Sequence, residues 1–562
     1  MNRGRKPSRT VSSRAPLRLR LEHEYRVQPL ALPGRSRVES PDDLMRCAAV
    51  ALFVHHARLA RRNFAMDDAN AEVIIDIAHR LDGLPLAIEL AAARLAYLPL
   101  ATLRDRLQQR LHILTGGNRD LPARQQQMRN TIAWSYELLP PAEQALLCQL
   151  AAFSGSWTLE AAEDVCSTAT GAEGVLDGLG ALAEHSLIIP LETIAGEPRY
   201  RMLDTIREFG IEQASASGEL AVIQQRHALY YLRLAEQAES ALQDRNQVVW
   251  YPLLEREHDN IRAALGWLLR VDEVELALRL AGAVWRFWHR HGDILEGGRW
   301  LEDGLARGQD VAKPVRAKAL WGASWLAYHH GEYARGSVLS AEQLSLAREL
   351  GDALSTRNAL TGIGVAALAE GKCDDAIRAL QDALDVCEPL GNIWHRATSR
   401  LNLGAATLVA GDLDRATTLL EEAVRLYQER GDEVFVSRTR QHLGYVSLRR
   451  GDFMRAESIF AESLRSLATL DEKSGIADGL EGVAATWAAN GQAYQAGVLI
   501  GAADALREQV GVAPLPYIRL VWQPFVTDAE SSLGAERWQG ARAEGMALAL
   551  REAVAHAVQG ED

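Results

Sequence analysis

The sequence predicts a mostly α-helical protein whose C-terminal part is a solenoid of paired antiparallel helices. Five turns begin 40 residues apart, at Gly331, Gly371, Gly411, Gly451 and Gly491. A second set lies halfway between them: Gly351-Asp352, Gly391-Asn392, Gly431-Asp432 and the degenerate Asp471-Glu472. Apolar residues between the turns follow helical spacing. Two turns per repeat leave helices of about 17 residues, each about 25 Å long.

The chemistry of the turns supports this prediction. Glycine ends a helix in the left-handed conformation, and a following Asp or Asn caps the next helix. Small residues recur where two helices must approach closely, at Gly364, Gly404 and Gly444 in first helices and at Ala376, Ala416 and Ala456 in second helices. This pattern resembles the tetratricopeptide repeat, whose usual unit is shorter, about 34 residues. We count five repeats over residues 311–510.

Stacked helix pairs form a superhelix with a concave face that usually binds partners. The resemblance implies that first helices line this face. The predicted partner-binding residues are Trp321, Trp325, Tyr328, Asn358, Thr361, Arg438, Gln441, Tyr445, Asp478 and Glu481. For Trp321 and Trp325 an alternative is packing between repeats. We expect the groove to bind a protein, a peptide or a small effector.

Composition restricts the function classes. A chain of 562 residues is long enough for several domains, and 48% hydrophobic with 24% charged residues is typical of a soluble globular protein. A net charge of −13 argues against a broad nucleic-acid-binding face. The first twenty residues are the exception, with seven Arg or Lys and no acid. We interpret them as an exposed tail, with a nucleic-acid arm as the alternative.

Several chemistries are not indicated. The five cysteines form no CxxC pair, and neighbouring histidines such as His55-His56 lack the spacing of helical metal ligands. No apolar run reaches the roughly 18 residues that span a bilayer, and no signal peptide is recognisable. No GxSxG motif or isolated carboxylate pair occurs. We therefore expect a cytoplasmic, membrane-free protein without a metal, which is not an enzyme.

The region before the repeats carries motifs of a known bacterial family. They include Ser13-Arg14, the run GLPLAIELAAAR at 83–94, FSGSW at 153–157, YRMLDTIREF at 200–209 and EREHDNIRAA at 255–264. Together they resemble STAND-type regulators of the LuxR and AfsR-like kind, which are signal-transduction ATPases related to NB-ARC proteins. The resemblance covers residues 11–310, and with the repeats it covers nearly the whole chain.

The resemblance implies an order of domains. Residues 1–36 are then a basic tail and the remnant of a nucleotide-binding core, and residues 37–125 a helical subdomain. Residues 126–218 form a winged-helix-like domain, 219–310 a helical linker, 311–510 the repeats and 511–562 C-terminal helices. Apolar segments at Leu187–Ile189 and Tyr200–Leu203 flank a polar turn, which suits a wing hairpin.

The nucleotide-binding motifs of the family are missing. No GxxxxGK[ST] loop occurs, and no apolar strand ending in paired acids precedes residue 11. The resemblance leaves Arg14 and Pro85 as vestigial nucleotide contacts, although Pro85 also suits a plain helix start. Leu203 replaces the histidine of the Met-His-Asp motif that reaches bound ADP in relatives. We expect an N-terminally truncated member that needs no cofactor, whereas full-length relatives bind ATP or ADP.

Direct DNA binding is not expected. The candidate recognition helix, Val175–His185, contains Asp177 and Glu184 but no Arg or Lys. In the family this domain serves mainly as an internal lever, and a C-terminal LuxR-type DNA-binding module would begin about where this chain stops. We predict a regulatory protein that binds a partner through its repeats, with self-association or association with full-length relatives as further partners. Two alternatives stay open: an ATP-dependent transcriptional regulator whose P-loop and DNA-binding parts lie upstream or on a partner, and a scaffold for protein–protein interaction.

Overall fold

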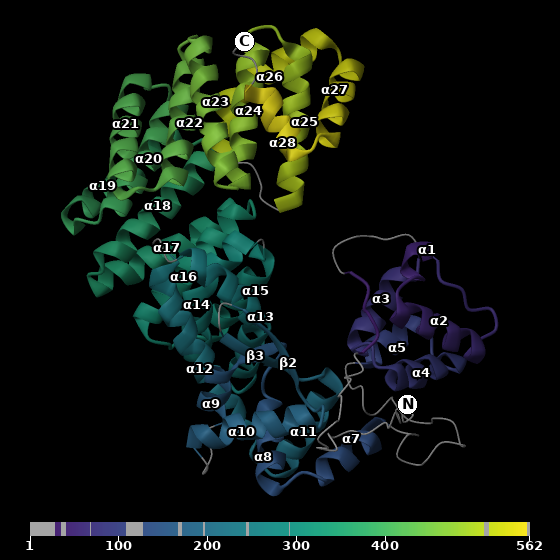
Figure 1. Cartoon of the computed structure of the whole chain (residues 1–562). Coiled ribbons are helices and arrows are strands. Elements are labelled where there is room, and N and C mark those ends of the chain that lie inside the picture. The colour runs from purple at the N-terminus through teal and green to yellow at the C-terminus, as the bar shows by residue number, and fades with distance from the viewer. Residues whose placement is uncertain are drawn as a thin grey trace, which may run out of the picture. The chain divides into compact units, whose positions relative to one another are not determined.

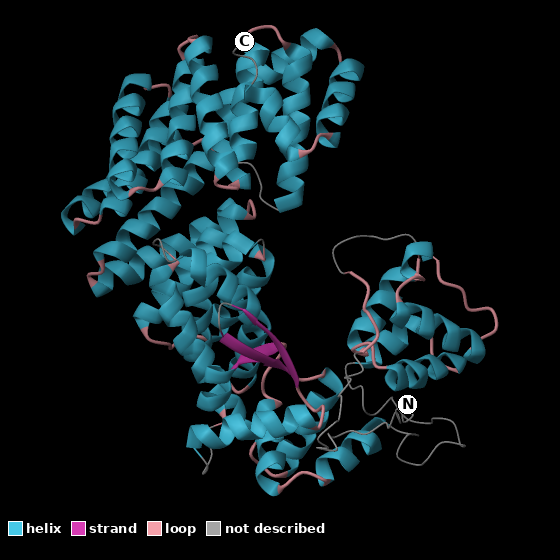
Figure 2. Ribbon diagram, in the orientation of Figure 1, coloured by secondary structure: helices cyan, strands magenta, loops and turns pink. Residues whose placement is uncertain are grey.

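The computed structural model describes residues 29–34, 41–67, 69–107, 128–166, 171–194, 197–242, 247–291, 293–510 and 516–558. It confirms the predicted fold class, because helices make up most of these residues and a small sheet lies in the first half of the chain (Figure 2). The chain divides into two compact units, Met1–Leu234 with Val248–Val271, and Ala235–Gln247 with Asp272–Asp562. The predictions for the basic tail and for Arg14 lie outside the described residues.

The first unit opens with a small helical bundle. Its elements are α1 (Pro41–Leu44), α2 (Ala48–Ala60), α3 (Ala71–Arg80), α4 (Pro85–Ala93), η1 (Arg94–Ala96) and α5 (Leu100–Arg106). Helix α2 buries one stripe, Ala49, Val50, Phe53, Val54 and Ala57, at the spacing of one helical face, and it packs against α4. Pro85 is the first residue of α4, where its missing N–H leaves no helical hydrogen bond unmade.

The winged-helix part follows in the same unit. It consists of α7 (Met128–Glu137), α8 (Pro141–Leu150), β1 (Ser156–Thr158), α9 (Leu159–Val165), α10 (Gly171–Glu184), β2 (Ile189–Ile194), β3 (Glu197–Arg201) and α11 (Asp204–Ala216). The sheet is antiparallel with the order β1-β3-β2. The second wing strand begins earlier than residues 200–203 predicted, and it ends at Arg201 because α11 starts at Asp204. Strand β1 was not predicted, since three residues give no readable alternation.

Long helices connect this part to the repeats: α12 (Leu220–Ala241), α13 (Gln247–Arg270), α14 (Val274–His291) and α15 (Ile294–Arg307). Antiparallel helix pairs then follow along the chain (Figure 1). They are α16 and α17 (Lys313–His329, Tyr333–Leu350), α18 and α19 (Ala353–Ala369, Cys373–Cys387), α20 and α21 (Ile393–Ala410, Leu413–Arg430), α22 and α23 (Glu433–Arg449, Phe453–Thr469), and α24 and α25 (Lys473–Ala489, Ala493–Val510).

The turns of the array have the predicted chemistry. Glycines such as Gly411 and Gly451 adopt positive φ at helix ends, and the carboxylates of Asp412 and Asp452 accept hydrogen bonds from backbone N–H groups of the next helix. Asp471 takes the left-handed conformation itself, with φ 51°, where the series lacks its glycine. Local sequence therefore determines where each helix of the array ends.

Close helix contacts explain the small residues of the first helices. A Cβ added at Gly364 would lie 2.5 Å from Leu380, and one at Gly404 would lie 2.9 Å from Leu420. Leu380 and Leu420 are almost completely buried, so these neighbours have little freedom to move. The glycines thus set the distance between the two helices of a pair.

Three helices complete the second unit: α26 (Pro516–Leu533), α27 (Ala535–Ala547) and α28 (Leu550–Val558). Helix α26 contacts α18, α20, α22 and α24, which are all first helices of their pairs, and it also contacts α25. Helix α27 packs on α25, and α28 contacts α23, α24 and α25. None of the helices in the described part of the chain has the length and apolarity needed to cross a bilayer.

Candidate partner-binding site on the repeat array

All ten predicted partner-binding residues lie on first helices, and the structure brings five of them together. Arg438, Gln441 and Tyr445 of α22 and Asp478 and Glu481 of α24 line one cavity, together with His442 and Ile518. The cavity is only about 10 Å³, which is room for one water at most. Ile518 belongs to α26, so the chain's own helix fills this part of the array.

We call the side of the first helices that carries Trp325, Asn358, Arg438 and Asp478 the inner face. One helix of 18 residues touches α18, α20, α22 and α24, so these four helices present a common surface. Such a helix is about 27 Å long, which matches several adjacent helix pairs. The inner faces of these four helices therefore accommodate one helix, α26.

A buried charge cluster lies beneath α26. Arg507 of α25 donates from Nε and a terminal nitrogen to the two carboxylate oxygens of Glu481, both at 2.9 Å, and to Asp478 Oδ1 at 2.6 Å. Arg438 contacts the other oxygen of Asp478 at 3.5 Å. The cluster satisfies its own charges within the array.

Burial and charge act against each other in this cluster. Burial raises the pKa of Glu481 to about 7, although Arg507 opposes the shift. Burial lowers the pKa of Arg507, but Asp478 and Glu481 outweigh it and hold that pKa above its usual value. A pKa of about 7 implies that Glu481 is partly protonated at neutral pH, whereas the raised pKa of Arg507 implies an ionised carboxylate beside it. The two-pronged contact at 2.9 Å is that of a carboxylate with a guanidinium, so the ionised pair is the state that the structure describes.

Gln441 and Tyr445 connect first helices to each other. Gln441 Nε2 donates to the carbonyl of Gly475 at 2.8 Å, and the Tyr445 hydroxyl donates to the carbonyl of Asp478 at 3.3 Å. The Tyr445 ring meets Phe460 edge to face, with centroids 4.9 Å apart. Both side chains are at most 2% exposed. Both side chains line the small cavity between α22, α24 and α26.

The predicted aromatic residues of α16 divide into two kinds. Tyr328 is buried, and its hydroxyl lies 2.9 Å from the Ser340 hydroxyl of α17, so it packs within its helix pair. Trp321 is also buried and meets Trp285 of α14 at a centroid distance of 6.0 Å. Trp325 is half-buried, 5.1 Å from Trp321. Of the three, Trp325 keeps the most surface for a partner.

The two predicted residues of α18 differ in the same way. Thr361 is buried and donates to the carbonyl of Arg357 at 2.9 Å. Asn358 is half-buried, and its Oδ1 accepts from Arg357 at 2.9 Å. Arg357 itself is 1% exposed and otherwise bonds Ser399 and the carbonyl of His395. Burial lowers the pKa of Arg357.

Sequence reasoning predicted C-terminal helices over residues 511–562, but it missed that α26 packs on the first helices and that Arg507 joins the charge cluster. The buried side of α26 consists of Tyr517, Ile518, Val521, Trp522, Val526 and Ala529, which form one helical stripe. This stripe was a readable signal of a helix with one apolar side, although not of the surface that the helix covers. Arg507 is one of three charged residues near the end of α25, with Asp504 and Glu508, so the sequence does not single it out.

Of the two predicted vestigial nucleotide contacts, Pro85 lies in the described part of the chain and Arg14 lies outside it. Pro85 is exposed, whereas the turn before it supplies Asp82, which is 3% exposed with φ 53°. Asp82 Oδ2 accepts from the backbone N–H of Asp204 at 2.9 Å, and Oδ1 accepts from Arg201 at 3.3 Å. Asp82 therefore occupies the N-terminus of α11, a place that suits anions.

A cavity of about 280 Å³ lies next to this contact. It is lined by Pro29, Leu30, Leu32, Asp82, Ile189, Leu191, Arg201 and Leu203. Six of these side chains are apolar, and the acidic one is Asp82. No lysine is among them.

The two arginines of strand β3, Arg199 and Arg201, each pair with an acidic residue of the same chain. Arg199, which is 3% exposed, forms an ion pair with Glu257 of α13 at 2.6 Å. Tyr231 and Asn260 donate to the other oxygen of Glu257 at 2.9 and 3.1 Å. These contacts join strand β3 and the motifs at 153–157 and 255–264 in one buried network, in which Asn260 also donates to the carbonyl of Ser156.

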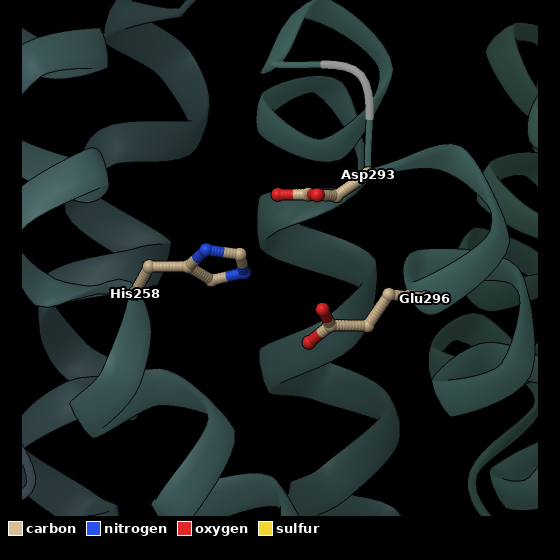
Figure 3. A group of neighbouring side chains, drawn as sticks. All are labelled: His258, Asp293 and Glu296. Carbon is tan, nitrogen blue, oxygen red and sulfur yellow. The ribbon is translucent and has the colours of Figure 1, made fainter. Parts of the chain in front are cut away.

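Figure 3 shows the side chains of His258, Asp293 and Glu296. Asp293 precedes α15, and Glu296 in its first turn accepts from Trp300 Nε1 at 3.1 Å. His258 belongs to the first compact unit and the two acids to the second. We assign no site to these three residues.

Known proteins resemble this chain in parts. Residues 139–214 match the family model of a winged helix-turn-helix domain, and residues 396–430 match that of a tetratricopeptide repeat. A Mycobacterium tuberculosis protein named "Putative HTH-type transcriptional regulator" is 33% identical over 384 residues. A Mycobacterium bovis protein of the same name aligns with the same identity. The alignment covers 65% of this chain and 43% of each relative, so the chain spans less than half the length of these relatives.

Two solved structures also resemble it at low identity. A STAND protein with a tetratricopeptide repeat sensor from Pyrococcus horikoshii has a TM-score of 0.41 at 13% identity, covering 92% of this chain and 74% of that one. Aspartyl phosphate phosphatase F of Bacillus subtilis has a TM-score of 0.40 at 12% identity, covering 86% and 98%. The chain is thus a relative of mycobacterial proteins named as HTH-type transcriptional regulators, with a winged helix-turn-helix domain followed by tetratricopeptide repeats.

Proposed function

We propose that this protein is a signal-transducing regulator that binds a protein or peptide partner on the inner face of its repeats. A regulatory role agrees with the names of its relatives. The observation that carries the proposal is the seat of α26, by which we mean the surface of α18, α20, α22 and α24 on which α26 packs. A surface that accepts one helix across four helix pairs has the shape and the apolar contacts that another polypeptide segment needs.

We further propose that the winged helix-turn-helix domain is an internal joint in this chain. DNA-binding domains hold phosphates with Arg and Lys side chains. Here Arg199 is engaged by Glu257 and Arg201 by Asp82, and the described part of α10 carries no basic residue. The side chains that would contact DNA are therefore absent from the helix or already paired in the wing.

We also propose that the chain holds no nucleotide of its own. The sequence has no phosphate-binding loop, and the buried carboxylate of Asp82 already caps α11. A phosphate at that helix end would meet a like charge instead of free N–H groups. A nucleotide site on another chain, or on residues beyond these 562, is compatible with this proposal.

Complementation in the native host tests the proposal. The gene is deleted and replaced by the wild-type gene, by Trp325→Ala on the inner face, or by Met454→Ala, a 77% exposed residue of the second helix α23. We expect the wild type and Met454→Ala to restore the transcript profile, and Trp325→Ala to fail at unchanged protein level. Full restoration by Trp325→Ala, or an unchanged profile after deletion, would overturn the proposal.

A second candidate is part of an ATP-dependent transcriptional regulator whose other parts lie outside these residues. The length of the relatives favours it, because the alignment covers 43% of each. The genomic DNA upstream of Met1 provides the test. An in-frame phosphate-binding loop there supports this candidate, and an in-frame stop codon directly before Met1 contradicts it.

A further inference from the structure

Helix α26 is held differently from the helices on either side of it. Its seat side is apolar, with Ile518, Val521 and Trp522 each at most 6% exposed. The side-chain hydrogen bonds of α26 stay within the helix, such as Arg519 to Gln523 and Gln523 to Thr527. Within the described part of the chain, no hydrogen bond or ion pair joins α26 to the first helices.

The groups beneath α26 need nothing from it. Arg438, Asp478, Glu481 and Arg507 are paired with one another. The indole N–H of Trp522 is buried without a hydrogen-bond partner. The contact therefore rests on apolar packing, which is non-directional and can be replaced by any helix with a similar stripe.

Helix α27 shows the opposite kind of attachment. A Cβ at Gly501 of α25 would lie 2.1 Å from the carbonyl oxygen of Arg542, and one at Gly545 would lie 1.8 Å from that of Val498. Tyr494 donates to Glu544 at 2.7 Å across the same contact. The backbones of α25 and α27 are therefore in close contact. In the sequence, α26 lies between these two tightly packed helices.

Helix α26 contains an internal proline and an exposed apolar residue, and a glycine follows its end. Pro524 lies inside α26 and cannot donate the backbone hydrogen bond of its position. Leu520 is 52% exposed on the side away from the seat. Gly534 separates α26 from α27, and its φ of 86° lies in the region that favours glycine.

We propose that α26 is an exchangeable internal ligand, and that the inner face binds the amphipathic helix of a partner in its place. This proposal rests on the function proposed above and names its partner class. The partner helix carries an apolar stripe of aromatic and β-branched residues, spaced as in Tyr517, Ile518, Val521, Trp522 and Val526. The stripe needs no charge, because the charges of the face are already paired.

A peptide with the sequence of residues 516–533 is the probe. It is labelled with fluorescein and titrated with the whole chain, either wild type or with Val521→Asp, which places a charge in the seat. The control is Leu520→Asp, the exposed neighbour on the same helix. We expect the Val521→Asp chain to bind the peptide at least about tenfold more tightly than the wild type, with Leu520→Asp unchanged.

Salt dependence checks the chemistry of the contact. Between low and high salt the affinity should change by less than about twofold, since screening acts on charges and not on apolar burial. A folded Val521→Asp chain that binds the peptide no better than the wild type would overturn the proposal. Steep loss of affinity with salt would overturn its apolar chemistry.

Hydrogen exchange on the wild type covers the case in which Val521→Asp does not fold. We expect the amides of α26 to exchange at least about tenfold faster than those of α24 and α27, through local opening. Exchange of all three helices in one cooperative step contradicts the proposal. If the peptide fails to bind but Trp325→Ala abolishes complementation, this inference falls while the proposed function stands.

Discussion

Arg507 on the second helix of the last pair donates to Glu481 on the first, with two nitrogen–oxygen distances of 2.9 Å and both side chains at most 8% exposed. Asp478 shares the same guanidinium at 2.6 Å. This pairing holds α24 and α25 in register and neutralises the end of the inner face. It explains how a surface rich in charged residues accepts an apolar helix.

Breaking this pair should strongly destabilise the array. Arg507→Met leaves the buried carboxylate of Glu481 without its counter-ion, and the loss of one partner of a buried pair typically costs about 3–5 kcal/mol. Arg378→Ala is the control, because Arg378 pairs with Asp375 on the surface and such pairs contribute about 0–1 kcal/mol. Thermal unfolding followed by circular dichroism measures both. Equal melting temperatures for the two variants would show that the cluster does not stabilise the array.

The glycines of the first helices should tolerate no side chain. A Cβ at Gly444 would lie 2.8 Å from Phe460, which is fully buried, so Gly444→Ala should cost about 1–3 kcal/mol through overpacking. Gly540→Ala in α27 is the matched control, since its Cβ would meet nothing within 4 Å. That change should stabilise its helix by about 0.5–1 kcal/mol. Chemical denaturation distinguishes the two, and the same sign for both variants would contradict the packing argument.

The cap that Asp82 provides should matter for the first unit. Asp82→Ala removes the acceptor of the Asp204 N–H and the partner of Arg201, so it should cost about 1–2 kcal/mol. Asp76→Ala is the comparison, because Asp76 pairs with Arg80 at a partly exposed site. Limited proteolysis followed by mass spectrometry reports which segment opens. Faster cleavage near α11 in Asp82→Ala alone is expected, and equal cleavage of both variants would argue against the cap.

His227 should remain neutral well below the pH at which histidine usually titrates. It is buried beside Asn260, and burial lowers its pKa to about 4. Because this folded pKa lies below the unfolded value of about 6.5, the unfolded chain binds the proton first. Its contribution to stability is then complete above about pH 6.5 and is lost as the pH falls toward 4. Proton NMR of the imidazole measures this directly, and a midpoint near 6.5 in the folded protein would refute it.

Nucleotides should not bind to the chain. Isothermal titration with ADP and with ATP in the presence of magnesium is expected to give no heat of binding at micromolar concentrations. A control titration of Asp82→Ala asks whether removing the buried acid restores an anion site at α11. A clear micromolar isotherm for the wild type would contradict our account of this region.

Local features of the sequence predicted much of the array. Gly411 and Asp412 determine a helix end and the next helix start by backbone chemistry alone, so their pattern is readable without a structure. The position of α26 was not readable, because a stripe such as Val521 and Trp522 shows that a side is buried without showing what covers it. The same holds for Asp82, whose partner lies more than a hundred residues away.

The predicted site residues show the same limit. All ten predicted residues lie on first helices, but spacing alone does not separate the half-buried Trp325 from the buried Tyr328. That difference depends on the neighbouring helix, where the Ser340 hydroxyl lies 2.9 Å from the Tyr328 hydroxyl. Strand β1 was missed for a related reason, since its pairing with β3 is a long-range contact.

A photo-crosslinking amino acid at position 325 tests the central claim most directly. It is introduced into the whole chain in the native host, with position 454 on the exposed side of α23 as the matched control. We predict that irradiation gives a covalent adduct with a defined protein or peptide at position 325 and none at position 454. Adducts at position 454 alone, or at neither position, would contradict the assignment of partner binding to the inner face.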